Sequence, residues 1–229
     1  MKFSVIMPVY LQEYANCSSY REERFIYAVK SFQSQTLKNS ELIIISDGCD
    51  LAEQVYSREF SSDSRIRFDR VEKNGSFGGN PRNRGLEMAE GDLICYLDSD
   101  DFLGANHLKI ISESVSPEFD WFYYDDYYCR GKSSTKINVF LMRMTKIIEP
   151  MRIGTCSIVH KRELPIRWEG GYGHDHIFIQ ELKDYPCKKI KSPEYFICHI
   201  PDSTQSQFDI HDPRYLVFHQ DPLHIFGHK

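Results

Sequence analysis

The sequence lacks any apolar run that approaches the roughly 20 residues needed to cross a bilayer. Its first apolar run, Phe3 to Val9, is short and contains Pro8, unlike the hydrophobic region of a signal peptide. We therefore expect a cytoplasmic protein. Any membrane attachment would be peripheral, at the inner face of the membrane.

Paired cysteines and excess positive charge are also missing. The seven cysteines are odd in number and include no Cys-x-x-Cys pair, which argues against a disulfide framework and against a zinc site. The formal net charge is −5, so nucleic acid is not an expected partner. The sequence has no repeat, low-complexity tract or linker, and 229 residues suit one compact domain.

The first half of the sequence alternates between apolar strands and amphipathic helices. Four such units over residues 3–115 predict an α/β protein with an open, mostly parallel sheet flanked by helices. The third strand, 65–71, is less apolar and is expected near the sheet edge. The second half predicts a smaller mixed region. Its expected elements are one aromatic strand at 119–128, a polar turn at 131–135, a strand at 155–160, a helix from about residue 174, and short strands at 187–190 and 195–200.

Three carboxylates follow the fourth predicted strand. The apolar run that ends at Leu97 gives way to Asp98, Asp100 and Asp101 within four residues. Carboxylates without partners repel one another and lose hydration on burial, so this arrangement needs an explanation. A bound Mg²⁺ or Mn²⁺ is one, because these ions accept carboxylate oxygens and leave positions for substrate phosphates. A solvated turn with a helix cap is the alternative.

Polar turns also follow the first two predicted strands, at Pro8-Val9-Tyr10 and Ser46-Asp47-Gly48. Ligands of open parallel sheets bind outside the carboxyl ends of the strands, so these turns are expected to line one crevice with the acidic turn. The glycine-rich stretch 75–79 is neither a P-loop nor a dinucleotide fingerprint, because it lacks the residues that complete either motif. Asp50 is expected to cap the helix after the second strand, and Gly91 to end the helix after the third.

Five stretches of the first half together form a family pattern. They are FSVIMPVY at 3–10, AVKSFQSQT at 28–36, ELIIISDG at 41–48, PRNRG at 81–85 and GDLICYLDSDD at 91–101. In them the sequence resembles the family 2 glycosyltransferases, closely over residues 3–104 and more loosely to about residue 200. The resemblance implies the GT-A fold and a metal-dependent, inverting hexosyl or hexosaminyl transfer. The donor would be a nucleoside-diphosphate sugar, with a family-level preference for UDP, and the product a surface polysaccharide or another glycan.

The resemblance implies which residues bind the base of the donor. Pro8 and Val9 would meet the base edge through backbone groups, and Tyr10 would stack on the ring. Asp47 would hydrogen-bond the base. The alternatives are that Tyr10 is a boundary aromatic with its hydroxyl in water and that Asp47 is a turn residue before Gly48.

The resemblance also assigns residues to the diphosphate and the cation. Arg82 and Asn83, near a helix start, would face the anionic donor, although Asn83 could instead brace the loop that holds the carboxylates. Asp98 and Ser99 would bind the nucleotide sugar, with Asp98 against the ribose or base. Asp98 and Asp100 would contact Mn²⁺ or Mg²⁺.

Two further residues are expected near the cation. His199 follows a late strand, where members of the family sometimes supply a third metal ligand, and imidazole suits Mn²⁺ acceptably. Asp101 is expected to be structural, either behind the metal ligands or as a helix cap.

An inverting transfer needs a base that takes the proton of the acceptor hydroxyl. In the family this base is the Asp of a Glu-Asp pair at a helix start. Asp175 matches the Asp, but His174 replaces the Glu, and the alternative is that Asp175 is only a helix N-cap. Trp168 could stack on a sugar ring or pack in the core. Asp125 or Asp126 could touch the acceptor, although a solvated strand edge is the favoured interpretation.

Two other functions stay open on the sequence alone. A non-catalytic module that binds nucleotide sugars or glycans on the same fold is suggested by His174 in the place of the expected Glu. A nucleotidyltransferase is weaker, because it would need a glycine-rich basic loop after the first strand and residues 11–24 contain no glycine.

The predicted organisation is one domain over residues 1–200. A nucleotide-sugar-binding half, 1–115, precedes an acceptor-side half, 116–200, and a tail follows at 201–229. The expected partners are a nucleotide-sugar donor and a glycan or lipid-linked glycan acceptor. A homodimer, or a peripheral membrane contact through apolar residues of the tail, is left open.

Overall fold

The computed structural model describes residues 1–15, 17–18, 20–133, 136–142, 153–171 and 173–198. The first elements are β1 Phe3–Val9, α1 Arg21–Gln33, β2 Ser40–Asp47, α2 Asp50–Glu59, β3 Ile66–Val71, α3 Gly79–Met88, β4 Leu93–Tyr96, β5 Phe102–Leu103 and α4 His107–Ser114. After them come β6 Trp121–Tyr123, β7 Asp126–Ser133, β8 Lys136–Met142, the 3₁₀ helix η1 Thr155–Ser157, β9 Ile158–Lys161, α5 His174–Leu182, β10 Cys187–Lys189 and β11 Tyr195–Ile197.

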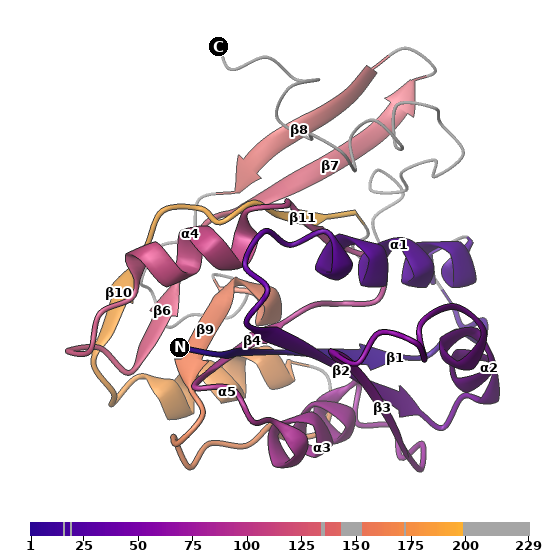
Figure 1. Cartoon of the computed structure of the whole chain (residues 1–229), viewed down its shortest axis with the longest axis horizontal. Helices are drawn as coiled ribbons and strands as arrows, with labels where there is room; N and C mark the ends of the chain where they lie inside the picture. The colour runs from indigo at the N-terminus through magenta and orange to yellow at the C-terminus, as the bar shows by residue number, and fades with distance from the viewer. Residues whose placement is uncertain (16, 19, 134–135, 143–152, 172, 199–229) are drawn as a thin grey trace.

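Two sheets organise these elements. The large sheet has the strand order β10-β6-β9-β4-β1-β2-β3, and the small sheet has the order β5-β11-β7-β8. In Figure 1, α1 and α4 lie on one face of the large sheet, and α3 and α5 lie on the other. The β7–β8 hairpin extends away from the large sheet on the side of α1 and α4 (Figure 1).

The parallel part of the large sheet comes from the first half of the chain. β1 pairs in parallel with both β2 and β4, and β2 pairs in parallel with β3. Every residue of β2 is buried, as expected for a strand covered by helices on both faces. β3 lies at the edge, and only its first residue is fully buried. The predicted α/β class and the open, mostly parallel sheet are confirmed.

The aromatic stretch 119–128 forms two strands, so the prediction of one strand was wrong. β6 joins the large sheet antiparallel to β9, whereas β7 joins the small sheet against β8 and β11. The chain changes sheets between them, where the Tyr124 hydroxyl donates to the Cys156 carbonyl oxygen. The backbone of β7 continues to Ser133, so a strand occupies part of the predicted polar turn. The predicted strand at 155–160 begins as η1 and becomes β9 only at Ile158.

Two helix ends also differ from the prediction. Cys49, rather than Asp50, is the N-cap of α2, and Asp50 is the first helical residue, paired with Arg70. α3 ends at Met88 instead of Gly91. Gly91 serves a close approach, because a Cβ there would lie 2.5 Å from the backbone nitrogen of Ser4.

Among the described residues, no helix is long and apolar enough to cross a membrane. The predicted tail, 201–229, lies outside the described residues. The division of residues 1–200 into a nucleotide-sugar-binding half and an acceptor-side half stays a prediction.

Candidate active site

The three predicted turns meet at one edge of the large sheet. Because β1 runs parallel to β2 and β4, the carboxyl ends of all three strands point the same way. Tyr10 follows β1, Asp47 ends β2, and the acidic turn that starts at Asp98 follows β4. The sequence therefore predicted correctly that these residues share a sheet edge.

Asp47 is a buried carboxylate with an open acceptor. Its exposed fraction is 8%, and among the described residues its Oδ1 has no hydrogen-bond partner. Burial raises the pKa of Asp47, and the charge of Lys73 partly opposes this rise. The Lys73 ammonium lies 2.8 Å from the centroid of the Tyr10 ring. A ligand that donates an N–H group would satisfy Asp47, since an unmatched buried acceptor is unfavourable.

The turn after β1 is fixed by a residue that the sequence did not identify. The Arg21 guanidinium, at the start of α1, donates to the carbonyl oxygen of Tyr10. The Tyr10 hydroxyl donates to Gln12 Oε1 at 2.9 Å. Val9 is 2% exposed and Pro8 is half-buried, so their side chains pack while the turn beyond them faces the edge.

The acidic turn is closed by its own backbone. The Asp101 N–H donates to the Asp98 carbonyl oxygen at 3.1 Å, which places Ser99 and Asp100 between them. Asp100 Oδ2 accepts a hydrogen bond from the Ser18 hydroxyl at 3.3 Å. The loop after β1 thus contacts the acidic turn.

Asp101 lies behind the turn and points into the protein. Its Oδ2 accepts from the Tyr195 hydroxyl at 2.9 Å, and its Oδ1 accepts from the Cys198 N–H at 2.7 Å. Burial and the nearby charge of Asp100 raise its pKa well above the usual range. Asp101 is therefore a structural residue. It does not cap α4, whose N-cap is Asn106.

The carboxylates of the acidic turn are of the type that binds a hard divalent cation. Ligand atoms of Asp98, Asp101 and Cys156 lie within 4.8 Å of one another. Both oxygens of Asp101 are already bonded, and a thiol is a poor ligand for Mg²⁺ or Mn²⁺. Asp98 and Asp100 offer the carboxylate oxygens that such ions prefer. His199, the predicted third ligand, lies outside the described residues.

Arg82 is the buried centre of the site. It is 4% exposed and lies in the first turn of α3. Its Nη2 donates to Asp98 Oδ1 at 2.7 Å, and its Nη1 lies 3.3 Å from His174 Nε2. Burial lowers the pKa of Arg82, but the charges of Asp98 and Asp175 outweigh burial and raise it. A buried guanidinium requires such partners.

Gly78 makes room for this guanidinium. A Cβ at Gly78 would lie 2.7 Å from Arg82 Nη1, and the backbone there has a φ of +92°, which disfavours other residues. The glycine-rich stretch therefore shapes the space around Arg82, a role that its sequence pattern did not indicate.

Asp175 lies in the first turn of α5 and is not its cap. The N-cap is Gly173, at a φ of 84°, so the N-cap alternative is wrong. Asp175 Oδ1 accepts from the Thr155 hydroxyl and lies 2.8 Å from His174 Nε2. Burial raises the pKa of Asp175, but the hydrogen bond and charge of His174, the charge of Arg82 and the Thr155 hydroxyl together hold it below its usual range. The side chain is still 41% exposed, so an ionised carboxylate faces the surface.

Asn83 ties the loop before α5 to α3. Its Nδ2 donates to the Trp168 carbonyl oxygen at 2.7 Å, and its Oδ1 accepts from the Trp168 N–H at 2.8 Å. Asn83 therefore braces a loop. That loop leads to His174 and is not the acidic turn after β4.

Trp168 packs in the core, which is one of the two alternatives that the sequence left open. It is 3% exposed, and its ring stacks on Phe178 at 3.8 Å between centroids. Its Nε1–H donates to the Tyr96 hydroxyl at 3.1 Å. Stacking on a sugar ring is contradicted by this burial.

Asp125 and Asp126, where β7 begins, contact β10 and η1. Asp126, expected at a solvated edge, is 1% exposed and accepts from the Ser157 hydroxyl. Asp125 is paired with Lys189 at 2.7 Å. No local motif identifies Thr155 or Ser157 as hydrogen-bond partners of carboxylates, because the carboxylates they contact lie far away in the sequence.

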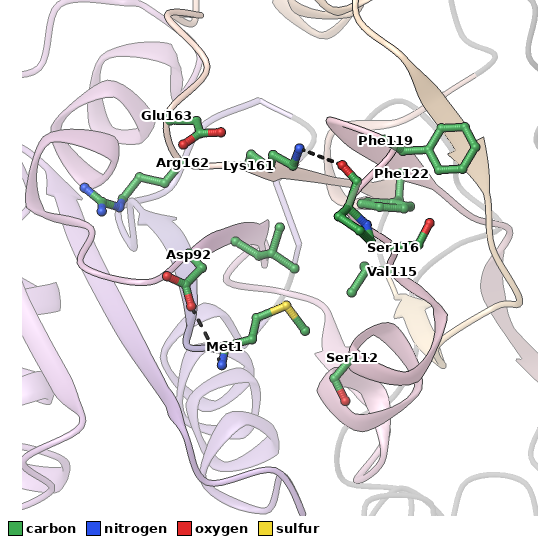
Figure 2. Close-up of a pocket in the computed structure, with 12 residues that line it drawn as sticks. Met1, Asp92, Ser112, Val115, Ser116, Phe119, Phe122, Lys161, Arg162 and Glu163 are labelled. Carbon is green, nitrogen blue, oxygen red and sulfur yellow. Dashed lines mark hydrogen bonds and ion pairs between the residues drawn. The ribbon is translucent and has the colours of Figure 1, made fainter.

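A cavity of about 420 Å³ lies at the opposite edge of the large sheet (Figure 2). It is lined in part by Met1, Asp92, Phe119 and Lys161. Met1 and Asp92 precede β1 and β4, and the Met1 amino group lies 3.9 Å from Asp92 Oδ2. None of the predicted site residues lines this cavity, so it is separate from the candidate site at the carboxyl ends of the strands.

Comparison with known proteins gives relatives with glycosyltransferase names. The model of glycosyl transferase family 2 matches residues 4–164. An uncharacterized glycosyltransferase of Haemophilus influenzae is 35% identical over 107 residues, which cover 46% of this chain and 39% of the relative. The poly(ribitol-phosphate) β-N-acetylglucosaminyltransferase TarS of Staphylococcus aureus is 30% identical over 111 residues, which cover 48% of this chain and 18% of TarS. The chain spans less than half the length of these relatives.

Solved structures share the fold. The structure of S. aureus TarS 1–349 in complex with UDP-GlcNAc matches with a TM-score of 0.66 at 18% identity, over 89% of this chain and 60% of that one. GalNAc-T7 with UDP, GalNAc and Mn²⁺ matches with a TM-score of 0.61 at 12% identity, over 89% of this chain and 45% of that one. Since the family model covers more than half of the sequence, the chain belongs to glycosyl transferase family 2, and it has the GT-A fold.

Proposed function

We propose that the chain transfers a sugar, with inversion, from a nucleoside-diphosphate sugar to an acceptor hydroxyl, and that Asp175 is the base. One observation supports this proposal most directly: the charges of Asp98 and Asp175, 77 residues apart in the sequence, both act on the buried Arg82 guanidinium. A carboxylate suited to the donor and a carboxylate suited to the acceptor are thereby held in one network.

The roles follow from the chemistry of each group. Asp47 accepts a hydrogen bond from the base, and Tyr10 offers it a ring face. Asp98 and Asp100 hold Mn²⁺ or Mg²⁺, which when bound neutralises charge on the leaving nucleoside diphosphate. Arg82 keeps the Asp98 carboxylate oriented.

Asp175 takes the acceptor's proton as its oxygen attacks the anomeric carbon. Among the described residues, both of its hydrogen bonds fall on Oδ1. Oδ2 is therefore the atom that meets the hydroxyl. Attack from the face opposite the diphosphate inverts the anomeric centre, and the bond to the diphosphate breaks with its electrons.

The relatives support a UDP-linked donor and a glycan product. TarS is named for N-acetylglucosamine transfer to poly(ribitol-phosphate), and its structure binds UDP-GlcNAc. A third relative, AmsB of Erwinia amylovora, is named for amylovoran biosynthesis. We propose a hexosyl or hexosaminyl donor and a glycan or lipid-linked glycan acceptor, with the reaction taking place in the cytoplasm at the inner face of the membrane.

A donor panel tests the proposal. The chain is incubated with UDP-, GDP- and dTDP-linked sugars and Mn²⁺, and release of nucleoside diphosphate is followed with and without acceptor glycans. At least one donor is expected to turn over. Asp100→Ala should reduce transfer at least about 100-fold, since it removes a cation ligand. Transfer at the wild-type rate in that variant would contradict the metal role of Asp100.

The alternative is a module that binds nucleotide sugars without turnover. His174, in the place where the family has Glu, is the observation that favours it. Saturable binding of UDP-GlcNAc by calorimetry, with no release from any donor of the panel, would support this alternative over the enzyme.

A further inference from the structure

His174 lies where two charged side chains of the site meet. Its Nδ1 is 3.0 Å from the Gly171 carbonyl oxygen, which can only accept a hydrogen bond. Nδ1 therefore carries a proton in every state of the ring that keeps this contact. Only Nε2 can therefore change between hydrogen-bond acceptor and donor.

Nε2 faces one donor and one acceptor. Arg82 Nη1, at 3.3 Å, can only donate, and the ionised Asp175 Oδ1, at 2.8 Å, can only accept. A neutral ring therefore accepts from Arg82, whereas a protonated ring donates to Asp175. The nitrogen cannot bond to both in the same state.

The groups around His174 determine what changes in the site when its ring gains a proton. Arg82 is paired on its other side with Asp98, and the Cys156 thiol lies near the guanidinium. Thr155, from η1, holds the same Asp175 oxygen that faces the ring. The edge of Trp168, 5.6 Å away between centroids, closes a further side without charge. Among the described residues, the charged groups facing His174 are thus Arg82 and Asp175, with Asp98 beyond Arg82.

We propose that His174 is a positioning residue that accepts the acceptor's proton from Asp175 and, in doing so, releases Arg82 toward Asp98 and the departing diphosphate. This inference rests on the proposed function. The proton moves from the acceptor oxygen to Asp175 Oδ2. Rotation of the carboxyl group then brings the protonated oxygen to His174 Nε2, the ring takes the proton, and the ring releases it to solvent after the products leave. The acceptor oxygen forms the glycosidic bond, and the sugar–diphosphate bond breaks with its electrons on phosphate oxygen.

A glutamate in this place would act differently. A carboxylate beside Arg82 would stay ionised and paired with the guanidinium, because an opposite charge favours the charged form. The imidazole can instead exchange Arg82 for Asp175 by gaining one proton. A histidine in this place therefore allows a coupling that a glutamate would not.

The first test reads the His174 ring directly and needs no turnover. The ring nitrogens of the full chain are followed by NMR as a function of pH, with His174→Gln used for assignment. We expect neutral His174 to be protonated at Nδ1. In Asp175→Asn, the pH midpoint of the ring signals should move down by about one unit or more, because the ring loses its anionic partner. A neutral ring protonated at Nε2, or a midpoint that does not move, would overturn the proposal.

The second test separates a relay from a merely structural contact. In His174→Gln, the amide can still bond to a neighbour but cannot take up a proton. We expect kcat to fall at least about tenfold, with KM for the donor within about twofold and a changed pH profile of kcat. The matched control is His176→Gln, in the same turn of α5, which should keep the wild-type profile. A His174→Gln variant with wild-type kcat and profile would overturn the relay.

The two tests keep this inference apart from the proposed function. If no donor of the panel turns over in the wild-type chain, the proposed transfer fails, and the NMR result still decides whether Asp175 controls the proton on His174. If transfer occurs and the NMR midpoint does not respond to Asp175→Asn, the proposed sugar transfer is supported and the relay through His174 is contradicted.

Discussion

The candidate site has two sides that hold their carboxylates by different means. On the strand-end side, Asp47 and the acidic turn after β4 sit where backbone pairing between parallel strands puts them. On the helix side, Asp175 is held by side chains from η1, α3 and its own helix. Register fixes the first side residue by residue, whereas the second depends on a few hydrogen bonds. The helix side should therefore be the more sensitive to single substitutions.

Arg82 is the residue that joins the two sides. It contacts Asp98 on the strand-end side and His174 on the helix side, and it is almost fully buried. Its neighbour Arg84 also forms ion pairs but is 42% exposed. Substitution of Arg82 should therefore affect both sides of the site, whereas substitutions on one side should leave the other intact.

Arg82→Ala should destabilise the protein by about 3–5 kcal/mol, because it removes a buried side chain with its packing and leaves Asp98 and Asp175 without their cation. Chemical denaturation measures this change in the free energy of unfolding. Arg84→Ala is the matched control and should cost less than about 1 kcal/mol, as exposed pairs do. Equal costs for the two variants would show that the guanidinium does not hold the sides together.

Asp126→Asn should stabilise the helix side at neutral and higher pH. Burial raises the pKa of Asp126 to about 7. The unfolded chain ionises near pH 4 and the folded one only near pH 7, so the unfolded state binds fewer protons in that window and stability falls as pH rises through it. The amide keeps an acceptor for Ser157 but has no charge to bury.

The expected gain at pH 8 is at most about 4 kcal/mol, at about 1.4 kcal/mol per pKa unit, and it should vanish near pH 4. Thermal unfolding from pH 4 to 8 measures it. Asp125→Asn, at the paired and less buried neighbour, should change this pH dependence little. A gain of the same size at pH 4 would mean that it does not come from the charge of Asp126.

Asn83→Ala should loosen the helix side and leave the strand-end side intact. It leaves the N–H and carbonyl of Trp168 without their partners, at a cost of about 1–3 kcal/mol. Hydrogen exchange should show the loss of protection in residues 168–171 and not in β1 or β2. Asn80→Ala, in the same helix, is the control. Protection lost equally in β1 would show that the two sides are not separable.

Lys73→Met acts on the strand-end side alone and should have the smallest effect. It removes the ammonium from the Tyr10 ring and the charge that opposes the raised pKa of Asp47. Affinity for UDP, measured by calorimetry, should fall about two- to fivefold, the size of an exposed cation–π contact. Lys109→Met, on the exposed surface of α4, should leave affinity unchanged.

The first half of the fold could be predicted from the sequence because its signals are local. A continuous apolar run such as 42–45 indicates a strand buried on both faces, and a polar turn after it marks the carboxyl end. The helices between the strands dictate parallel pairing, so Tyr10, Asp47 and Asp98 had to share an edge. The prediction of one strand over 119–128 was wrong for the opposite reason, because nothing within this stretch shows that its two ends pair with different sheets.

The family, the parallel sheet and the carboxylates at the strand ends could all be predicted from the amino-acid sequence. The contact of Arg82 with His174, 92 residues away, and that of Asp126 with Ser157, 31 residues away, became known only from the folded chain. Such contacts depend on how α3, η1 and α5 pack against the sheet, and no local pattern of apolar and polar residues encodes that packing. Strand periodicity specifies where a residue lies along the sheet edge, whereas the partner of a buried charge is set by whatever group the folded chain brings within hydrogen-bond distance.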